Sequence, residues 1–265
     1  MMRKQFPQLK DEWKLLPAPP IANAPGCMND YMIEKLLSGE VTNLNRITRF
    51  TKKGIVTEEQ GEIECDAVIC ATGMSFDYST LNIEADPTSY PTPEWDSHEN
   101  SQGLKYPRLY RTLIHPSFPD TLAFIGPCRG VTFAAFTNSD LSSQAIAQLW
   151  TGRYPLPSSR EMERWCDENY RFSLNQIKPH RVPKVGSRPD EFEKWLNEVA
   201  GNGVNEMLGW GKEGWMFWWK ERKLYRLLMD GIPTPFLYRL FEGREGGRKK
   251  WDGAREAIYK ANGIV

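Results

Sequence analysis

The sequence predicts a mixed α/β fold, in which a small β-meander and a partial parallel sheet are followed by a helical region. Three observations support this prediction. Residues 41–71 consist of short strand-like segments separated by turn residues, two apolar segments end at Gly73 and Gly126, and apolar residues recur at helical spacing from Thr151 onward. As a fragment of a larger fold, the chain would be classed as α+β.

The composition excludes several classes of protein. The chain has 265 residues, of which 40% are hydrophobic, and this is enough for a packed core. Its 34 basic and 34 acidic residues balance, so the chain lacks the basic excess of a nucleic-acid-binding protein. No apolar run is long enough to span a membrane and no secretory signal is found, so a cytoplasmic location is expected.

The cysteines and histidines form no recognisable motif. The five cysteines are odd in number and lack Cys-x-x-Cys spacing, which favours reduced, mostly buried thiols over a disulfide framework. The three histidines are scattered among prolines and loops, and none has a second histidine at helical spacing. We therefore predict no metal site.

The first part of the chain predicts a lead-in and one short helix. Prolines forbid a regular helix over much of residues 1–28, which we expect to be extended. Asn29 or Asp30 has the right chemistry to cap a helix over residues 30–39, and Gly39 is suited to end it.

A β-meander is predicted next. Residues 41–50 and 55–57 are strand-like, with a Lys-Lys-Gly turn between them, and after a second turn the last strand runs from Ile63. Within this strand, Ala67–Ala71 is apolar without alternation, which is typical of a strand covered on both faces.

The middle of the chain predicts a connection, a second strand and a helix. Residues 75–120 are rich in Pro, Ser, Asn and Asp and have little periodicity, and a connection of this length is usually functional or crosses between domains. Thr121–Gly126 is a second apolar strand. A helix follows, for which Thr137 and Asp140 have the spacing of a capping box. One face of this helix is apolar, formed by Leu141, Ala145, Ile146 and Leu149.

The remaining residues predict a series of helices. Ser158 and Glu161 form a second capping box, for a helix that reaches about residue 175. Ser187 is expected to cap the next helix, and residues 212–231 to form a single further one.

One glycine-rich segment imitates a phosphate-binding loop. Gly209, Gly211 and Gly214 match Gly-x-Gly-x-x-Gly, and Asp230 lies where a ribose-binding acid would be sought. The motif requires a strand before its first glycine, whereas the preceding residues are helical. We therefore interpret this segment as a flexible turn between helices.

The tryptophan-rich segment "WMFWWK" at residues 215–220 allows two interpretations. Its aromatic residues could rest on a membrane surface. In a single helix, however, the charged side chains of residues 220–223 would point in all directions around the axis, so no side of the helix would be uniformly polar. Packing in a core or between domains is therefore favoured, and the membrane surface is the second choice.

Three segments, taken in order, resemble the flavin-containing monooxygenase family. They are "DAVICATGMSFDYSTL" at 66–81, "PRLYRTLIHPSFPDTLAFIGPCRGVTFAAFTNSDLSSQAIAQLWTGRYPLPSSREM" at 107–162 and "TPFLYRLFEGREGGRKKWDGAREAI" at 234–258. The resemblance covers most of the chain from about residue 29. The family's glycine-rich FAD loop, active-site segment and NADPH loop have no counterpart in this sequence.

The resemblance implies a division of the chain. Residues 1–28 would be a lead-in, residues 29–73 the end of an NADPH-binding domain, residues 74–150 the returning half of an FAD-binding domain, and residues 151–265 a helical C-terminal region. The whole would be an incomplete flavoprotein fold with two dinucleotide-binding domains.

The resemblance also implies cofactor-binding residues. The Thr-Gly turn lets the backbone approach a ligand closely, and a strand ending in glycine lies at the sheet edge where α/β proteins bind ligands. A helix that begins near Thr137 or Asn138 would aim free N–H groups at the pyrimidine oxygens of a flavin. Asp140 is better interpreted as a cap than as a ligand, and Cys70 and Cys128 as core or loop thiols. The implied cofactor-binding residues are Thr72, Gly73, Gly126, Thr137 and Asn138.

The activity implied is that of an oxidoreductase, a flavin-dependent monooxygenase that uses FAD, NADPH and O₂ to oxygenate N, S or a carbonyl carbon of a small-molecule substrate. Without the glycine loops, we expect this chain to be truncated and inactive or weak alone, and a separate N-terminal half is an expected partner. No catalytic residue is assigned. The alternatives are a non-catalytic interaction module and a peripheral membrane protein on the cytosolic face.

Overall fold

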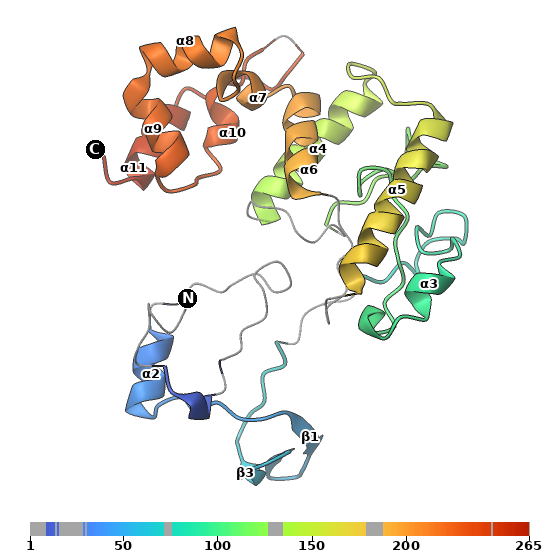
Figure 1. The fold of residues 1–265 in the computed structure, drawn as a ribbon, viewed down its shortest axis with the longest axis vertical. Helices are drawn as coiled ribbons and strands as arrows, with labels where there is room; N and C mark the ends of the chain where they lie inside the picture. The colour runs from blue at the N-terminus through green and yellow to red at the C-terminus, as the bar shows by residue number, and fades with distance from the viewer. Residues whose placement is uncertain are drawn as a thin grey trace. The chain divides into compact units, whose positions relative to one another are not determined.

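The computed structural model describes residues 9–13, 15, 29, 31–71, 76–126, 135–178, 188–244 and 246–264. The chain forms two compact units, residues 1–75 and 76–265. Figure 1 shows the small sheet of the first unit and the helices of the second. The fold is mixed, with helices and one three-stranded sheet among the described residues. Most of the predicted lead-in lies outside these residues.

The first unit begins with two short helices, η1 (Asp11–Trp13) and α2 (Met32–Ser38). The Asn29 side chain caps α2, since its Oδ1 accepts hydrogen bonds from the backbone N–H groups of Tyr31 (2.9 Å) and Met32 (2.7 Å). Gly39 ends the helix in the left-handed conformation, with φ of 79°. The prediction of an Asn29 cap and a Gly39 stop is confirmed.

The predicted β-meander is present and is antiparallel. It consists of β1 (Ile47–Phe50), β2 (Gly54–Thr57) and β3 (Gly61–Glu64), in the order β1-β2-β3. Ile55 pairs with Phe50 on one side and with Ile63 on the other. Gly54 is required by close packing, because a Cβ at this position would lie 2.0 Å from the carbonyl oxygen of Ile63. No parallel strand pair occurs among the described residues, so the predicted parallel sheet is not found there.

The last strand ends earlier than predicted. β3 stops at Glu64, and residues 67–71 are extended without a partner strand among the described residues. Their apolar side chains are exposed instead of covered on both faces: Ile69 is 90% exposed, and Val68 and Cys70 are also exposed. The prediction of a buried strand is wrong for Val68, Ile69 and Cys70, because no second layer or adjacent strand among the described residues covers them. An extended apolar segment with unpaired backbone groups is a surface on which another strand can pair.

The second unit begins with the long irregular connection that the sequence predicts. It holds only α3 (Pro93–Asp96) and η2 (Glu99–Ser101), yet it contributes to the core. Trp95 and Tyr106 are buried with Leu174 and Ile177 in one cluster. The Trp95 indole donates a hydrogen bond to the carbonyl oxygen of Leu104 (2.8 Å), which closes the loop on itself.

The predicted strand Thr121–Gly126 is reduced to isolated bridges. Ile114 bridges Tyr110 and Ala123, and the Phe124 N–H donates to the carbonyl oxygen of Leu113 (2.7 Å). The segment therefore packs against the irregular connection that precedes it. Among the described residues it forms isolated bridges and not a continuous strand.

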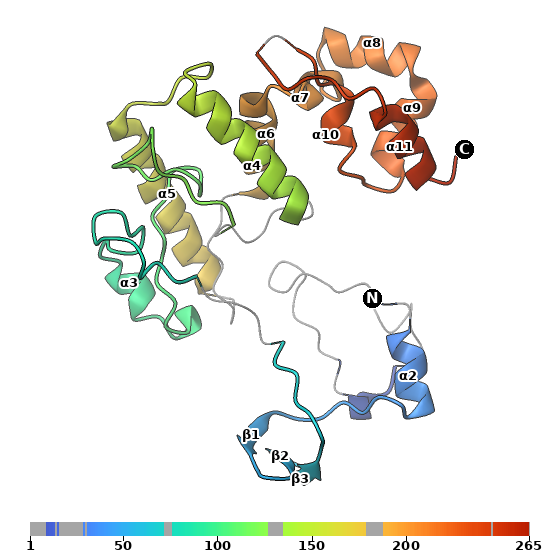
Figure 2. The same ribbon diagram turned by 180° about the vertical axis from the view of Figure 1, so that it is seen from behind.

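Three helices build the main core of the second unit: α4 (Ala135–Trp150), α5 (Ser159–Ile177) and α6 (Pro189–Ala200). Figures 1 and 2 both show α4 beside α6. The predicted apolar face of α4 is confirmed, since Leu141, Ala145, Ile146 and Leu149 are all buried. The capping box predicted at Thr137 is wrong, because α4 already begins at Ala135.

The other predicted caps differ in outcome. Ser158 caps α5 in a complete capping box, with its side chain accepting from the Glu161 N–H and the Glu161 carboxylate accepting from the Ser158 N–H. Ser187 lies outside the described residues, and α6 has Arg188 at its N-cap position.

The remaining helices are α7 (Val204–Met207), α8 (Lys212–Lys220), α9 (Arg222–Asp230), α10 (Leu237–Leu240) and α11 (Ala254–Ala261). They share a smaller core around Phe217, Leu224 and Ile258. The single helix predicted over residues 212–231 is wrong, because Glu221 has φ of −124° and ψ of 41° and separates α8 from α9. No helix among the described residues is both long and apolar enough to cross a bilayer.

A buried arginine attaches the irregular connection to α5. The Arg108 side chain is 9% exposed and pairs with Asp167 (2.7 Å) and with Glu163. Its guanidinium also lies over the Tyr90 ring, 4.4 Å from the ring centroid. Hydrogen bonds to the two carboxylates raise the pKa of Arg108 despite its burial, so it stays charged.

Replacing this arginine should destabilise the second unit. We expect Arg108→Met to lower the free energy of unfolding by about 2 kcal/mol, because hydrogen bonds between charged groups are lost. Arg188→Met is the control, since Arg188 and Glu191 form an exposed pair that should contribute less than about 0.5 kcal/mol. Urea unfolding measures both, and equal losses would contradict a special role for Arg108.

A buried histidine should make stability depend on pH. Burial lowers the pKa of His115 below its ordinary value of 6.5, although Glu163 and Asp86 oppose this. As the pH falls below 6.5, the unfolded chain binds a proton that the folded chain does not, so stability falls.

His115→Gln removes this contribution and should flatten the dependence of Tm on pH between about pH 8 and pH 5. His98→Gln is the control, because that side chain is only partly buried. An unchanged slope in His115→Gln would show that other groups cause the acid sensitivity.

Candidate functional site

The first turn of α4 holds two of the five predicted cofactor-binding residues. Thr137 and Asn138 are both buried there, 7% and 5% exposed. The first N–H groups of a helix have no partner within the helix and carry its positive dipole end. Thr72 and Gly73 lie outside the described residues.

Gly126 is described, and its conformation explains why the position holds glycine. Its φ is +113°, a value that side chains rarely adopt. Space is not the limit, because the nearest atom to an added Cβ would be Cε1 of Phe76, 3.9 Å away. The backbone here is therefore open to the approach of another group.

Two polar atoms on the buried side of α4 have no hydrogen-bond partner in the part of the chain that the structure describes. They are Oδ1 of Asn138 and Oγ of Ser142, and Ser142 is completely buried. Residues four apart lie on the same helix face, so the two atoms belong to one polar strip. A buried polar group without a partner costs roughly 1–3 kcal/mol, so an additional hydrogen-bonding group at this strip would be favourable.

Sequence reasoning missed Ser142. The available signal was its position four residues after Asn138, within the apolar face that includes Leu141 and Ala145. A serine inside an apolar stripe marks a place where a polar group is buried.

A pocket of about 320 Å³ lies beside Thr137. Its other lining residues come from α9, α10, α11 and the intervening loop, and they are mainly apolar: Leu227, Leu228, Ile232, Pro233, Thr234, Pro235, Leu237, Tyr238 and Ile258. An apolar pocket with few polar groups at a helix start suits the edge of a planar organic ring. The Tyr238 hydroxyl donates to Glu193 (2.9 Å), and burial followed by the nearby Glu193 charge raises the pKa of Tyr238.

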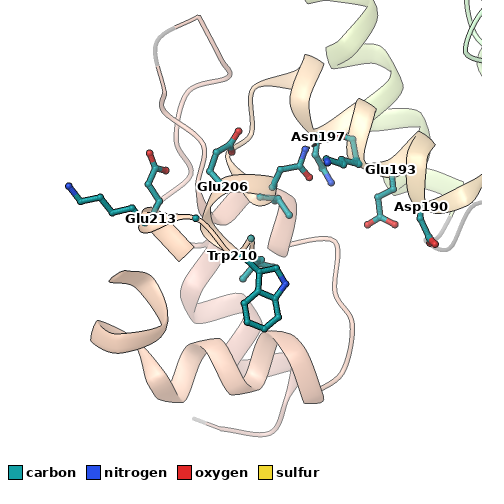
Figure 3. Close-up of a pocket in the computed structure, with 13 residues that line it drawn as sticks. Asp190, Glu193, Asn197, Glu206, Trp210 and Glu213 are labelled. Atoms are coloured by element: carbon teal, nitrogen blue, oxygen red, sulfur yellow. Dashed lines mark hydrogen bonds between the residues drawn. The ribbon is translucent and has the colours of Figure 1, made fainter. Parts of the chain in front are cut away.

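A larger pocket, of about 900 Å³, is lined with carboxylates (Figure 3). Asp190 and Glu193 come from α6, whereas Glu206 and Glu213 come from α7 and α8. Arg244 neutralises Glu206 (3.2 Å) and Glu213 (2.9 Å). Lys194 and Lys212 also line the pocket, so its four carboxylates are largely offset by nearby cations.

The glycine-rich imitation of a phosphate loop lies in this carboxylate pocket. Gly209 and Gly211 follow α7, a helix, and Gly214 lies within α8, so the strand that the motif requires is replaced by a helix. A Cβ on Gly214 would lie 1.9 Å from the Gly209 carbonyl oxygen, and one on Gly209 would lie 2.4 Å from that of Asn205. The interpretation as a helix-to-helix turn is confirmed, and close packing accounts for two of its glycines.

The described cysteines are free and differ in environment. Cys166 is buried, and its burial raises the pKa of the thiol to about 12. Cys65 is partly buried and Cys70 is exposed in a segment without helix or strand, so of the two predicted alternatives the loop thiol holds for Cys70. Cys128 lies outside the described residues. No group of three or more metal-ligating side chains occurs in the part of the chain that the structure describes.

The sequence is similar to flavin monooxygenases over nearly its whole length. Residues 2–263 match the family described as flavin-binding monooxygenase-like. The chain is 35% identical over 255 residues to the monooxygenase aurF of Gibberella zeae, covering 96% of this chain and 48% of that protein. It is 27% identical to human flavin-containing monooxygenase 5, covering 87% of this chain and 38% of the relative.

A further relative is senecionine N-oxygenase of Tyria jacobaeae, which is 29% identical over 62% of this chain and 33% of the relative. The chain thus spans about half or less of the length of these curated relatives. The family match extends from the first described helix through the start of α4 to α11. The chain therefore belongs to the flavin-binding monooxygenase-like family.

Proposed function

We propose that this chain provides part of a flavin-dependent monooxygenase that oxygenates a small molecule at nitrogen, sulfur or a carbonyl carbon. Family membership supports the reaction class. The names of the relatives, flavin-containing monooxygenase and N-oxygenase, support flavin use and oxygenation at nitrogen. When bound, FAD would supply the oxygen-activating chemistry and NADPH the electrons.

The observation that carries the proposal is the polar strip at the start of α4. Asn138 Oδ1 and Ser142 Oγ are buried and lack partners among the described residues, and Asn138 lies in the first described turn of α4. A carboxamide, a hydroxyl and backbone N–H groups suit a ring that carries both carbonyl oxygens and an N–H, as the pyrimidine end of a flavin does. In this proposal Thr137 and Asn138 bind and orient that ring.

The described residues fit one end of FAD and not the other. The glycine-rich turn at 209–214 is closely packed at Gly209 and Gly214 and follows a helix instead of a strand, so it does not suit a diphosphate. The Thr72-Gly73 turn and Gly126 remain candidates for close backbone contact with the cofactor. A diphosphate would therefore need a glycine-rich loop supplied by another polypeptide segment.

Residues 67–71 are the proposed attachment point for that segment. They are extended, apolar and exposed, and among the described residues no backbone hydrogen bond joins them to a neighbouring strand. The curated relatives contain about as much sequence again as this chain matches. We infer that a polypeptide equivalent to this remaining part pairs with residues 67–71 as an additional β-strand.

The attachment can be tested by reconstitution. The part of the Gibberella zeae relative that this chain does not match is co-expressed with the chain, and co-purification and flavin absorbance are measured. We expect a flavin-containing complex, little flavin on the chain alone, and loss of the complex in Ile69→Lys. Ile83→Lys is the control, because Ile83 is an equally apolar side chain that is 75% exposed elsewhere. Complexes that survive Ile69→Lys would contradict attachment at residues 67–71.

The polar strip can be tested by an apolar substitution. Asn138→Leu removes a buried carbonyl oxygen, Oδ1, that has no partner among the described residues, so we expect stability without flavin to stay equal or rise. Flavin affinity of the complex should fall about tenfold, because one hydrogen bond is lost.

Asn169→Leu is the matched control, since Asn169 is equally buried but donates to the Tyr106 hydroxyl (3.1 Å). It should lower stability by about 1–3 kcal/mol and leave flavin affinity unchanged. If Asn138→Leu instead lowers stability and leaves flavin affinity unchanged, Asn138 has a structural role.

A further inference from the structure

An exposed aromatic surface covers the turn before α8 and one side of that helix. We name it the tryptophan face and define it by Trp210, Trp215, Met216, Trp218 and Trp219. Trp210 is 89% exposed and Trp219 67% exposed, and Trp215 and Met216 are also exposed. The indole rings form a continuous series, with centroids 6.1, 5.7 and 6.3 Å apart from Trp210 to Trp219.

The core around Phe217, Leu224 and Ile258 does not include the residues of the tryptophan face. α8 contributes Gly214 and Phe217 to the interior, and the Phe217 ring packs against Phe241 with centroids 5.1 Å apart. Trp215 and Trp219 are four residues apart and lie on the other side of the helix. Figures 1 and 2 show α8 at the outer edge of the group formed by α7 to α11. The interpretation as core packing therefore holds for Phe217 and not for the exposed tryptophans.

The helix break at Glu221 divides the charged residues 220–223 between two helices, with Lys220 at the end of α8 and Arg222 and Lys223 at the start of α9. The Glu221 carboxylate accepts two hydrogen bonds of 2.9 Å from Arg255, so its charge is paired with a cation. Immediately after the break, the Arg222 guanidinium lies 4.9 and 4.5 Å from the ring centroids of Trp218 and Trp219. A cation thus stacks directly on the aromatic surface.

Basic residues outnumber acidic ones in the segment that carries the tryptophan face, and the Arg222 guanidinium contacts its rings. Residues 212–230 contain five basic and three acidic side chains, and two of the acids, Glu213 and Glu221, are paired with Arg244 and Arg255. The basic residues are Lys212, Lys220, Arg222, Lys223 and Arg226. The surface therefore combines exposed indoles with an uncompensated positive charge.

We propose that the tryptophan face binds the surface of an anionic lipid bilayer, with the indoles in the headgroup region and the basic side chains against the phosphates. Tryptophan favours this region because its ring is apolar and its N–H is polar. Lysine is depleted at protein–protein interfaces but contributes at anionic membranes, and this face has three lysines. The contact is peripheral and independent of flavin.

Sedimentation of the full chain with sucrose-loaded vesicles tests the proposal. Vesicles of phosphatidylcholine alone are compared with vesicles that also contain phosphatidylserine, at low and physiological salt. We expect binding to the phosphatidylserine vesicles that weakens with salt, together with a blue shift of tryptophan fluorescence.

Two sets of variants separate the contributions. Trp215→Ala with Trp219→Ala should weaken binding at least about tenfold, because two interfacial indoles are lost. Lys220→Glu with Lys223→Glu should weaken binding to the anionic vesicles only. Phe50→Ala is the control, because Phe50 is an exposed aromatic residue in the other unit and should not affect binding.

Circular dichroism is measured for each variant, and we expect the spectrum of the folded protein because the substituted side chains are exposed. Failure to sediment with anionic vesicles at low salt overturns the proposal, as does equal binding by the tryptophan variant. Light scattering adds a third outcome. If the protein is a dimer that Trp219→Ala converts to a monomer, the tryptophan face is a contact between copies of the chain and the lipid proposal is wrong.

Discussion

The packing of α4 against α6 is the interaction on which the rest of the second unit depends. Leu141, Ala145 and Leu149 of α4 share a core with Phe192 and Leu196 of α6, and all five are buried. Tyr110, Leu113 and Ile114 of the irregular connection join the same core. The connection has little secondary structure of its own, so these contacts and the Arg108 ion pairs determine its course. A loss of volume at Ala145 or Leu141 would therefore affect the helices and the connection together.

The same packing gives α4 two roles. Its apolar face stabilises the unit, while its first two turns carry Thr137, Asn138 and Ser142, whose side chains are buried beside that face. Two of their polar atoms lack partners among the described residues, which a helix serving only stability would avoid. A rigid helix with unsatisfied hydrogen-bonding groups is suited to hold a ligand in one orientation. This relation between core and site is the basis of the flavin-binding proposal.

Two exposed apolar surfaces require different partners. Residues 67–71 offer both backbone groups and side chains, which a strand of another polypeptide can match. The tryptophan face belongs to a helix whose backbone is already hydrogen-bonded, so it offers only side chains. Its indoles and basic side chains suit a surface that is apolar and anionic at once. The difference in backbone pairing is the reason for proposing a protein partner for residues 67–71 and a lipid surface for the tryptophan face.

Local signals in the sequence determined the Asn29 cap, the β-meander, the capping box at Ser158 and the apolar face of α4, because each depends on residues close together in the chain. They also sufficed to reject the glycine motif at 209–214, since its neighbours are helical. Tertiary structure decided the rest. Whether Ala67–Ala71 is a covered strand depends on other segments that pack on it, and apolar composition cannot supply them. The Glu221 carboxylate at the helix break pairs with Arg255, which is distant in sequence, and the missing partners of Asn138 and Ser142 depend on the segments packed around α4. Burial and pairing are properties of the whole fold, so a single sequence shows which residues are suited to a site but not which of them the fold leaves unsatisfied.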